Sequence, residues 1–169
     1  SDGGLHEVDV VVRATVFQAD RYVRPMNVTG LQGQTLEQAW SNVPTAYKSI
    51  SVPDFPNFYF MNGPTSPVGN CSLIDTSEMQ WGYIWQLIER VSDGSVAGLS
   101  AKSEALANYD QERLQAAKGS VFGSGCNSWY LDKNGVPNTW PWSQSRFREE
   151  MSQPVWQDYT HHQTEVVAA

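Results

Sequence analysis

A glycine- and proline-rich stretch at residues 63–70 (Gly-Pro-Thr-Ser-Pro-Val-Gly-Asn) joins two apolar segments of different periodicity. Residues 57–61 before it (Asn-Phe-Tyr-Phe-Met) have the aromatic and apolar composition of a buried β-strand. Residues 72–91 after it carry apolar side chains at helical spacing, namely Trp81, Ile84, Trp85, Ile88 and Val91. The sequence therefore predicts a strand, a tight loop and a long helix in that order, with Trp81 and Trp85 in the core.

A loop that ends at a helix N-terminus can direct backbone N–H groups at a negative or partly negative oxygen. Pro64 and Pro67 have no N–H to offer. The remaining donors are those of Thr65, Ser66, Val68, Gly69 and Asn70. The residues alone fit two interpretations: a rigid loop that caps a helix, or a site for an anion or a carbonyl group.

The whole pattern predicts an α/β fold, more closely an α+β-like fragment with a few short strands and two main helices. Residues 8–12 form a β-branched run typical of a buried strand in a mostly parallel sheet. Thr35 is expected to cap a short helix at 36–40. The second main helix is expected at 101–118, capped by Ser100 and ended by Gly119.

The last third of the chain predicts smaller elements. They are a short strand that begins at 121–122, an extended segment at 128–131, a turn at 132–135 and a helical turn at 146–151. We expect one domain over residues 1–158, followed by a flexible tail at 159–169.

Charge and cysteine content exclude several classes of partner. The net charge of −7 argues against nucleic acid and anionic membranes, and no apolar run approaches a membrane span. Cys71 and Cys126 do not make a disulfide framework, so we expect reduced thiols in a cytoplasmic protein. His161 and His162 are adjacent and do not converge on one metal ion, so no metal site is expected.

Four segments resemble the C-terminal portion of Baeyer–Villiger and related flavin-containing monooxygenases. They are residues 6–17, residues 35–40 together with 53–58, residues 62–67, and residues 125–130. The segments occur in the family's order with compatible spacing. The resemblance implies the C-terminal part of a flavoprotein fold that contains two dinucleotide-binding domains.

The departures from that family concern its nucleotide sites. Complete members carry two Gly-x-Gly-x-x-Gly turns, one for FAD and one for NADPH. This sequence contains neither, and Gly123-Ser124-Gly125 lacks the third glycine. Val16 also stands where the family has glycine. We therefore expect no cofactor to bind this chain alone, and FAD and NADPH to bind if an N-terminal part completes it.

The resemblance also implies particular site residues. Gly63, Pro64, Thr65, Ser66 and Asn70 would lie near the pyrimidine edge of the flavin. Trp129 and Tyr130 would lie near the nicotinamide and the substrate, with Trp129 as a candidate catalytic residue.

Other candidate site residues come from the sequence pattern alone. Asp75 and Glu78 are three residues apart on one helix and are candidates for an acid–base pair, or for complementing the helix dipole. Trp140 and Trp142 flank a proline and are candidates for the wall of an aromatic pocket, or for covering a core edge.

Three hypotheses for the function follow. The first is a portion of a flavin-dependent monooxygenase that is not competent for oxygenation by itself. The second is a stand-alone remnant that binds a small apolar molecule and catalyses a cofactor-independent cyclisation, isomerisation or dehydration. The third is a non-catalytic subunit. In each case we expect a homo-oligomer or a complementary chain, because the strands of the parent fold would otherwise leave open edges.

Overall fold

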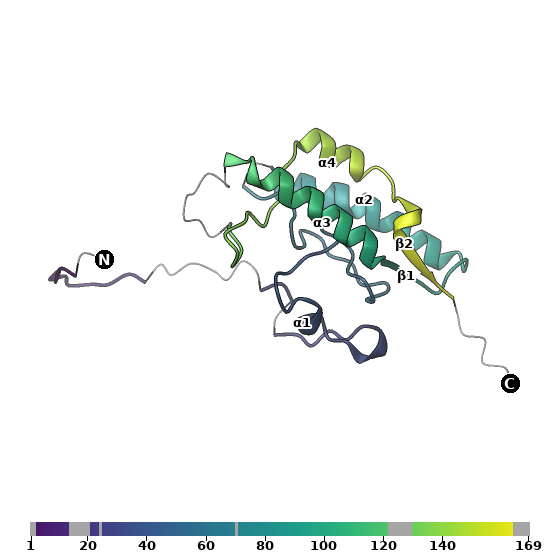
Figure 1. Cartoon of the computed structure of the whole chain (residues 1–169), viewed down its shortest axis with the longest axis horizontal. Helices are drawn as coiled ribbons and strands as arrows, with labels where there is room; N and C mark the ends of the chain where they lie inside the picture. Colours follow the sequence, from purple (N-terminus) through teal and green to yellow (C-terminus); the bar gives the residue numbers. More distant parts are fainter. Residues whose placement is uncertain (1–2, 14–20, 24, 70, 122–129, 164–169) are drawn as a thin grey trace.

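The computed structural model describes residues 3–13, 21–23, 25–69, 71–121 and 130–163, drawn in colour in Figure 1. The elements follow the order η1 (Leu31–Gly33), α1 (Leu36–Ala39), α2 (Leu73–Ser92), β1 (Gly98–Ala101), α3 (Ser103–Lys118), α4 (Gln144–Glu150), η3 (Trp156–Asp158) and β2 (Tyr159–His162). This mixture of short strands with two long helices, α2 and α3, confirms the predicted fold class.

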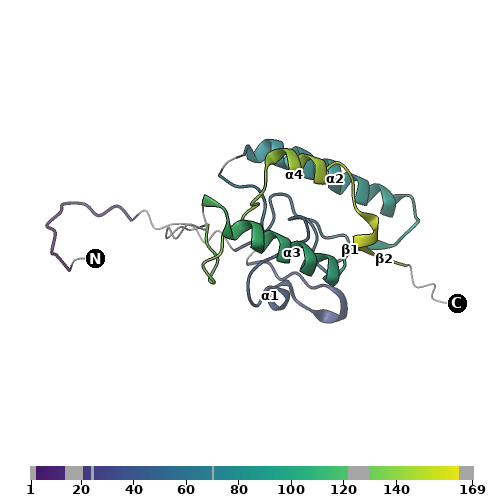
Figure 2. The same cartoon turned by 45° about the horizontal axis from the view of Figure 1, so that its top comes forward.

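The helices enclose the main core from two sides. Figure 2 shows α2 and α4 on one side of the body and α3 and α1 on the other. The core combines aliphatic residues of α2 and β1 with buried tyrosines from separate elements, namely Tyr47, Tyr83, Tyr109 and Tyr159. A second, smaller cluster packs Trp40 against Phe60 and Phe55. The long loop that contains residues 63–67 therefore runs between helices rather than over an open surface.

Helix α1 begins as the sequence predicts. The Thr35 side chain accepts a hydrogen bond from the backbone N–H of Gln38 at 3.2 Å, and the Gln38 side chain accepts one from the Thr35 N–H at 2.8 Å. This reciprocal pair is a capping box, which satisfies two N–H groups at the first turn.

Replacing Thr35 with alanine removes one half of the capping box. We expect a loss of about 1 kcal/mol in the free energy of unfolding, measured by urea denaturation. Thr35→Ser, which keeps the hydroxyl, is the matched control and should retain most of the stability. Equal losses for the two variants would show that the hydroxyl does not carry the effect.

The long helix α2 is confirmed, but its predicted buried face is wrong for the two tryptophans, whereas Ile84 is buried and Ile88 and Val91 pack against the core. The side chains that face the core are Thr76, Gln80, Tyr83, Ile84 and Leu87. Trp81 and Trp85 are instead 48% and 47% exposed. The reason is that α2 is apolar on two sides, and the side that packs inward includes two polar residues that a search for apolar periodicity passes over.

The prediction of a strand at residues 8–12 is also wrong. These residues form no strand, Asp9 lies in a bend, and the valines are 62–84% exposed. Figure 1 shows this segment leading away from the body of the molecule. β-branched residues favour a strand only when a neighbouring strand pairs with them, and no described residue does so here.

The segment at 57–61 forms only a single antiparallel bridge, between Tyr59 and Ser51. Asn57 and Asn62 at its two ends have φ angles of 60° and 51°, which fold the backbone out of the extended region. The predicted strand is therefore reduced to one residue, although Phe60 is buried as expected.

The predicted flexible tail is wrong for its first four residues. Tyr159–His162 form β2, which pairs antiparallel with β1 from Gly98↔His162 to Ala101↔Tyr159. Ser100 therefore lies in β1 and does not cap α3, which begins at Ser103 after Lys102. Its hydroxyl instead lies 2.9 Å from Nε2 of His162.

Of the smaller elements predicted in the last third of the chain, some are confirmed and one is wrong. The turn at 132–135 and the helical turn near 146–151 are confirmed, the latter as α4. Val121 is not in a strand and is 85% exposed. The predictions for Phe122, Ser128 and Cys126 fall outside the described residues.

Within the described residues, none of the helices combines the length and the hydropathy needed to cross a bilayer. The same residues contain no group of three or more His, Cys, Asp or Glu side chains arranged to hold a metal ion. The cytoplasmic location stays a prediction.

Candidate functional site

The loop of residues 63–67 is buried along its whole length. A Cβ atom at Gly63 would lie 2.4 Å from the backbone oxygen of Ser49 and 2.5 Å from Cβ of Phe60. These distances leave no space for any side chain, so the close approach of the 47–51 turn requires glycine at this position.

Two side chains of α2 hold the loop from one side. The backbone N–H of Asn62 donates to Oε1 of Gln80 at 2.7 Å, and Nε2 of Gln80 donates to Oγ of Ser66 at 3.3 Å. Nδ2 of Asn62 donates to Oγ of Ser77 at 2.7 Å. Gln80 is fully buried and bridges both ends of the loop, which explains a polar residue on the inner face of α2.

Hydroxyl groups hold the loop from the other side. Oγ of Ser49 and Oγ1 of Thr65 lie 3.2 Å apart, and both residues have no exposed surface. Burial raises the pKa of the neighbouring Tyr109 phenol, from α3, to about 12, and the hydroxyls of Thr65 and Ser49 offset part of this rise. The Tyr109 hydroxyl nevertheless has no hydrogen-bond partner of suitable geometry among the described residues.

The backbone around the loop is in an uncommon conformation. Thr65 and Asn62 have φ angles of 69° and 51°, and Ser49 and Lys48 in the adjoining turn have 64° and 50°. Non-glycine residues adopt this left-handed region rarely, at a cost of order 1–3 kcal/mol each, and such residues cluster at functional sites. The surrounding hydrogen bonds therefore stabilise a strained arrangement of these residues.

Backbone donors of this loop are left unpaired. Among the described residues, nothing accepts a hydrogen bond from the N–H groups of Gly63 or Thr65, although both residues are buried. The N–H of Val68, which is half-buried, is likewise unpaired within the described part of the chain. Buried backbone N–H groups without an acceptor are rare in proteins. The loop is thus equipped to bind a hydrogen-bond acceptor such as a carbonyl oxygen.

Replacing Gln80 with alanine removes the bridge between the two ends of the loop. We expect a loss of about 2 kcal/mol in the free energy of unfolding, because the Asn62 N–H and the Ser66 hydroxyl lose their partners in a buried place. Amide hydrogen exchange should accelerate at residues 62–66. Gln86→Ala, the same substitution at a half-buried position of α2 whose side chain bonds to Ser152 rather than to the loop, should not alter exchange in this segment. A similar acceleration in both variants would contradict the role given to Gln80.

The structure does not join Asp75 and Glu78 as an acid–base pair. Asp75 accepts from Nε2 of Gln144 at 2.5 Å and forms an ion pair with Arg148 at 3.4 Å, which links α2 to α4. Glu78 is exposed on the outer face of α2. No described hydrogen bond or ion pair connects these two carboxylates, and their proposed catalytic role stays a prediction.

The structure brings Trp140 to the loop through its backbone. Its N–H donates to the backbone oxygen of Ser66 at 3.3 Å. The ring is 3% exposed and packs on Trp142 and Phe147, with centroid distances of 4.6 and 5.0 Å. The guanidinium of Arg146 lies 4.0 Å from the centroid of Trp142. In the described structure, Trp140 packs inside the core and Trp142 covers its edge.

Tyr130 lies against the end of the loop. A Cβ at Gly69 would be 2.7 Å from the hydroxyl of Tyr130, so these two residues are close neighbours. Gly69 has a φ angle of 88°, which also favours glycine. Asn70 and Trp129 lie outside the described residues, so their predicted places beside a flavin and a substrate stay predictions.

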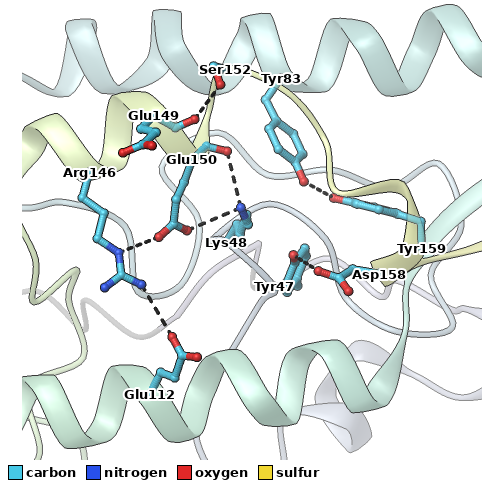
Figure 3. A network of polar contacts seen from close by, with 10 residues as sticks. All are labelled: Tyr47, Lys48, Tyr83, Glu112, Arg146, Glu149, Glu150, Ser152, Asp158 and Tyr159. Carbon is cyan, nitrogen blue, oxygen red and sulfur yellow. Dashed lines mark hydrogen bonds and ion pairs between the residues drawn. The ribbon is translucent and has the colours of Figure 1, made fainter.

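A network of charges beside the loop was not predicted from the sequence (Figure 3). Nζ of Lys48 lies 3.4 Å from Oε2 of Glu150 and donates to the backbone oxygen of the same residue. Arg146 binds the other carboxylate oxygen of Glu150 at 2.7 Å and reaches Glu112 of α3 at 3.5 Å. Lys48 directly precedes Ser49, so this network anchors the turn that contacts the loop.

Buried tyrosines continue the network in Figure 3. The Tyr47 hydroxyl donates to Oδ2 of Asp158, and the Tyr159 hydroxyl donates to that of Tyr83 at 3.1 Å. Burial, and then the hydrogen bond to Asp158, raise the pKa of Tyr47 above its ordinary value. Burial also raises the pKa of Tyr83. These phenols therefore stay protonated. Tyr47 donates to Asp158 of η3 and Tyr159 of β2 donates to Tyr83 of α2, so the two bonds connect this end of the chain to the core.

Curated relatives of the chain are monooxygenases. The chain is 41% identical to an uncharacterized monooxygenase of Mycobacterium tuberculosis over 147 residues, which are 87% of this chain and 30% of that protein. It is 34% identical to an FAD-binding monooxygenase of Aspergillus niger, covering 94% of this chain and 27% of that protein. A Baeyer–Villiger monooxygenase of Streptomyces coelicolor is 31% identical, and the match covers 89% of this chain and 30% of that protein.

Solved structures give the same result. The closed crystal structure of cyclohexanone monooxygenase matches 96% of this chain and 32% of its own, with a TM-score of 0.81 at 27% identity. An oxidized steroid monooxygenase bound to NADP matches 81% of this chain and 27% of its own, with a TM-score of 0.73 at 26% identity. No protein-family model matches the chain.

The chain therefore spans about 30% of the length of the curated relatives that it matches. These comparisons confirm the resemblance to the C-terminal region of flavin-dependent, Baeyer–Villiger-type monooxygenases.

Proposed function

We propose that this chain, which is similar to the C-terminal region of Baeyer–Villiger-type monooxygenases, supplies the loop that contacts the flavin in such an enzyme. In this proposal residues 63–67 receive the ring of FAD, and polypeptide outside these 169 residues holds the dinucleotides. The substrate class is that of the relatives' chemistry, an apolar ketone or an oxidisable heteroatom compound.

The unpaired N–H groups of Gly63 and Thr65 are the observation that carries the proposal. The pyrimidine edge of a flavin presents carbonyl oxygens, which accept hydrogen bonds from such donors. FAD and NADPH supply the oxygenating chemistry when they are bound, and the protein supplies position and electrostatics. The donor set of the loop fits the cofactor that the relatives' names imply.

The residues of this chain have positioning roles in the proposal. Gln80 fixes the two ends of the loop, and Ser49 fixes Thr65 from the opposite side. The low dielectric around a largely buried loop strengthens each hydrogen bond that its donors make. A carbonyl acceptor would then meet N–H groups that need no reorganisation.

The sequence also limits what the chain does alone. Neither Gly-x-Gly-x-x-Gly turn is present in the 169 residues, so the pyrophosphate of a dinucleotide lacks its usual binding loop. We therefore propose that the isolated chain does not bind FAD stoichiometrically and does not oxidise NADPH. The cofactor-independent and non-catalytic alternatives stay predictions, since no contact in the described structure favours either of them.

A chimera tests the proposed function. The matched 147-residue region of the M. tuberculosis relative is replaced by this whole chain, and FAD content and NADPH oxidation with a ketone panel are measured. We expect a yellow protein with one FAD per chain, whereas the isolated chain stays colourless. A well-folded chimera without FAD, or an isolated chain with stoichiometric FAD, would refute the proposal.

A further inference from the structure

The outer face of α2 carries an apolar surface that the fold leaves uncovered. It consists of Leu73, Ile74, Trp81 and Trp85 of α2 together with Met61 from the segment before the loop, which we call the outer α2 patch. Ile74 is 74% exposed and the other four are 47–49% exposed. A groove of about 360 Å³ runs along it, with Asn62, Ser77 and Glu78 as further lining residues. The rings of Trp81 and Trp85 lie 5.9 Å apart and extend the surface along the helix.

The size of the patch sets it apart from scattered surface residues. A tryptophan side chain has about 250 Å² of surface, so each half-exposed ring offers roughly half of that. The five side chains together expose on the order of 500 Å², comparable with the largest functional patches of monomeric proteins and with much of one side of a standard protein interface. Such a surface is typical of an interface with another polypeptide segment.

The position of the patch indicates which segment covers it. Met61 and Asn62, which line the groove, directly precede Gly63 of the candidate flavin loop. A polypeptide seated in the groove therefore lies beside that loop and beside the N-terminus of α2. Continuity between the patch and the loop favours an occupant that takes part in the same site.

The relatives contain enough additional polypeptide to cover the patch. In the closed cyclohexanone monooxygenase, the matched region is 32% of the chain, so about twice as much polypeptide lies elsewhere in that structure. The opposite face of α2, through Tyr83, Ile84 and Leu87, is already buried against the core of this chain. The outer face is thus the side of α2 that is available to the remaining polypeptide.

We infer that the outer α2 patch is the docking surface for the nucleotide-binding polypeptide, whether that polypeptide is joined to this chain or separate from it. The inference rests on the proposed function and extends it to a partner. The occupant presents an apolar face, and a neutral or basic group opposite the exposed carboxylate of Glu78.

Cysteine labelling tests the inference in the 169-residue chain and in the chimera described above. Cys71 and Cys126 are first replaced by serine in both proteins. Ile74→Cys and, separately, Trp85→Cys then report on the patch, and Val121→Cys, at a position 85% exposed and outside the patch, is the matched control. The rate of reaction with a maleimide is measured for each.

We expect labelling at Ile74→Cys and Trp85→Cys to be about tenfold slower or more in the chimera than in the isolated chain, because interface cores exclude solvent. The Val121→Cys rate should be the same in both. Equal rates at the patch in a chimera that unfolds cooperatively would overturn the inference, and so would slow labelling that occurs already in the isolated chain. In the latter case, light scattering that shows a dimer would assign the patch to a second copy.

The outcomes separate this inference from the proposed function. Protection of the patch in a chimera without bound FAD supports the docking surface and refutes the flavin role of the loop. A yellow, active chimera in which the patch is unprotected supports the flavin role of the loop and refutes the docking surface. If this chimera does not fold, the same labelling is carried out on a graft of the chain into the S. coelicolor relative. If the patch is not protected in either graft, the inferred docking surface is wrong.

Discussion

Gly63→Ala is expected to destabilise the chain by about 3 kcal/mol, at the upper end of the cost of overpacking a closed site. The added Cβ would lie 2.4 Å from the backbone oxygen of Ser49 and 2.5 Å from Cβ of Phe60. Both obstacles are close to the backbone and cannot rotate away, so the loop and the 47–51 turn have to separate. Urea denaturation followed by tryptophan fluorescence measures the change.

Gly82→Ala is the matched control for this variant. Gly82 lies on the outer face of α2, and a Cβ there would meet no atom within 4 Å. Since alanine favours a helix over glycine by about 1 kcal/mol, this variant should be more stable than the parent chain. Equal behaviour of the two variants would show that the close packing around Gly63 is not present in solution.

Glu150→Gln is expected to cost about 3 kcal/mol of folding free energy, as for other buried ion pairs that lose one partner. The Lys48 side chain is only 9% exposed, and Glu150 is the sole carboxylate within ion-pair distance in the described structure. The glutamine keeps the shape and still accepts a hydrogen bond from Arg146, so the loss reports on the uncompensated ammonium group. Chemical denaturation at constant ionic strength measures it.

Two controls separate charge from shape at this position. Glu149→Gln changes the adjacent carboxylate, which is exposed and forms no hydrogen bond or ion pair through its side chain among the described residues, so stability should change by less than about 0.5 kcal/mol. The double variant Lys48→Met with Glu150→Leu removes both charges and should recover most of the loss. A double variant as unstable as Glu150→Gln would contradict the ion-pair account.

Local signals in the sequence were sufficient for several elements that depend on neighbouring residues, although the predicted Ser100 cap of α3 was wrong. Thr35 caps α1 as predicted, because an N-cap hydrogen bond joins residues only three apart. The turn at 132–135 follows from its Asn-Gly pair. The four family-like segments were enough to identify the C-terminal region of the monooxygenases.

Elements that depend on distant partners were predicted less well. Residues 8–12 have strand propensity, but pairing is a tertiary property and no described strand provides it. Tyr159–His162 looked like a mobile tail because β1, its partner, lies some 60 residues earlier. The inner face of α2 was assigned only in part, because Gln80 is buried for its hydrogen bonds to the loop rather than for its hydropathy.

In the candidate site, too, the features with a local sequence signal were predicted and those that depend on distant residues were not. The loop at 63–67 was found from its glycines, its prolines and its place before a helix. The turn that holds it was not, because Lys48 and Ser49 have no distinctive local pattern and their partners Glu150 and Thr65 are distant in sequence. Paired burial of Lys48 and Glu150 has no signal in a single sequence.

The crystal structure of the FAD-loaded chimera is the most direct test of the central claim, that the buried loop presents its N–H groups to the flavin. The account predicts an acceptor atom of the flavin ring within about 3 Å of the backbone nitrogen of Gly63 or Thr65. A flavin ring bound away from residues 63–69, with both N–H groups paired to protein or water, would contradict it.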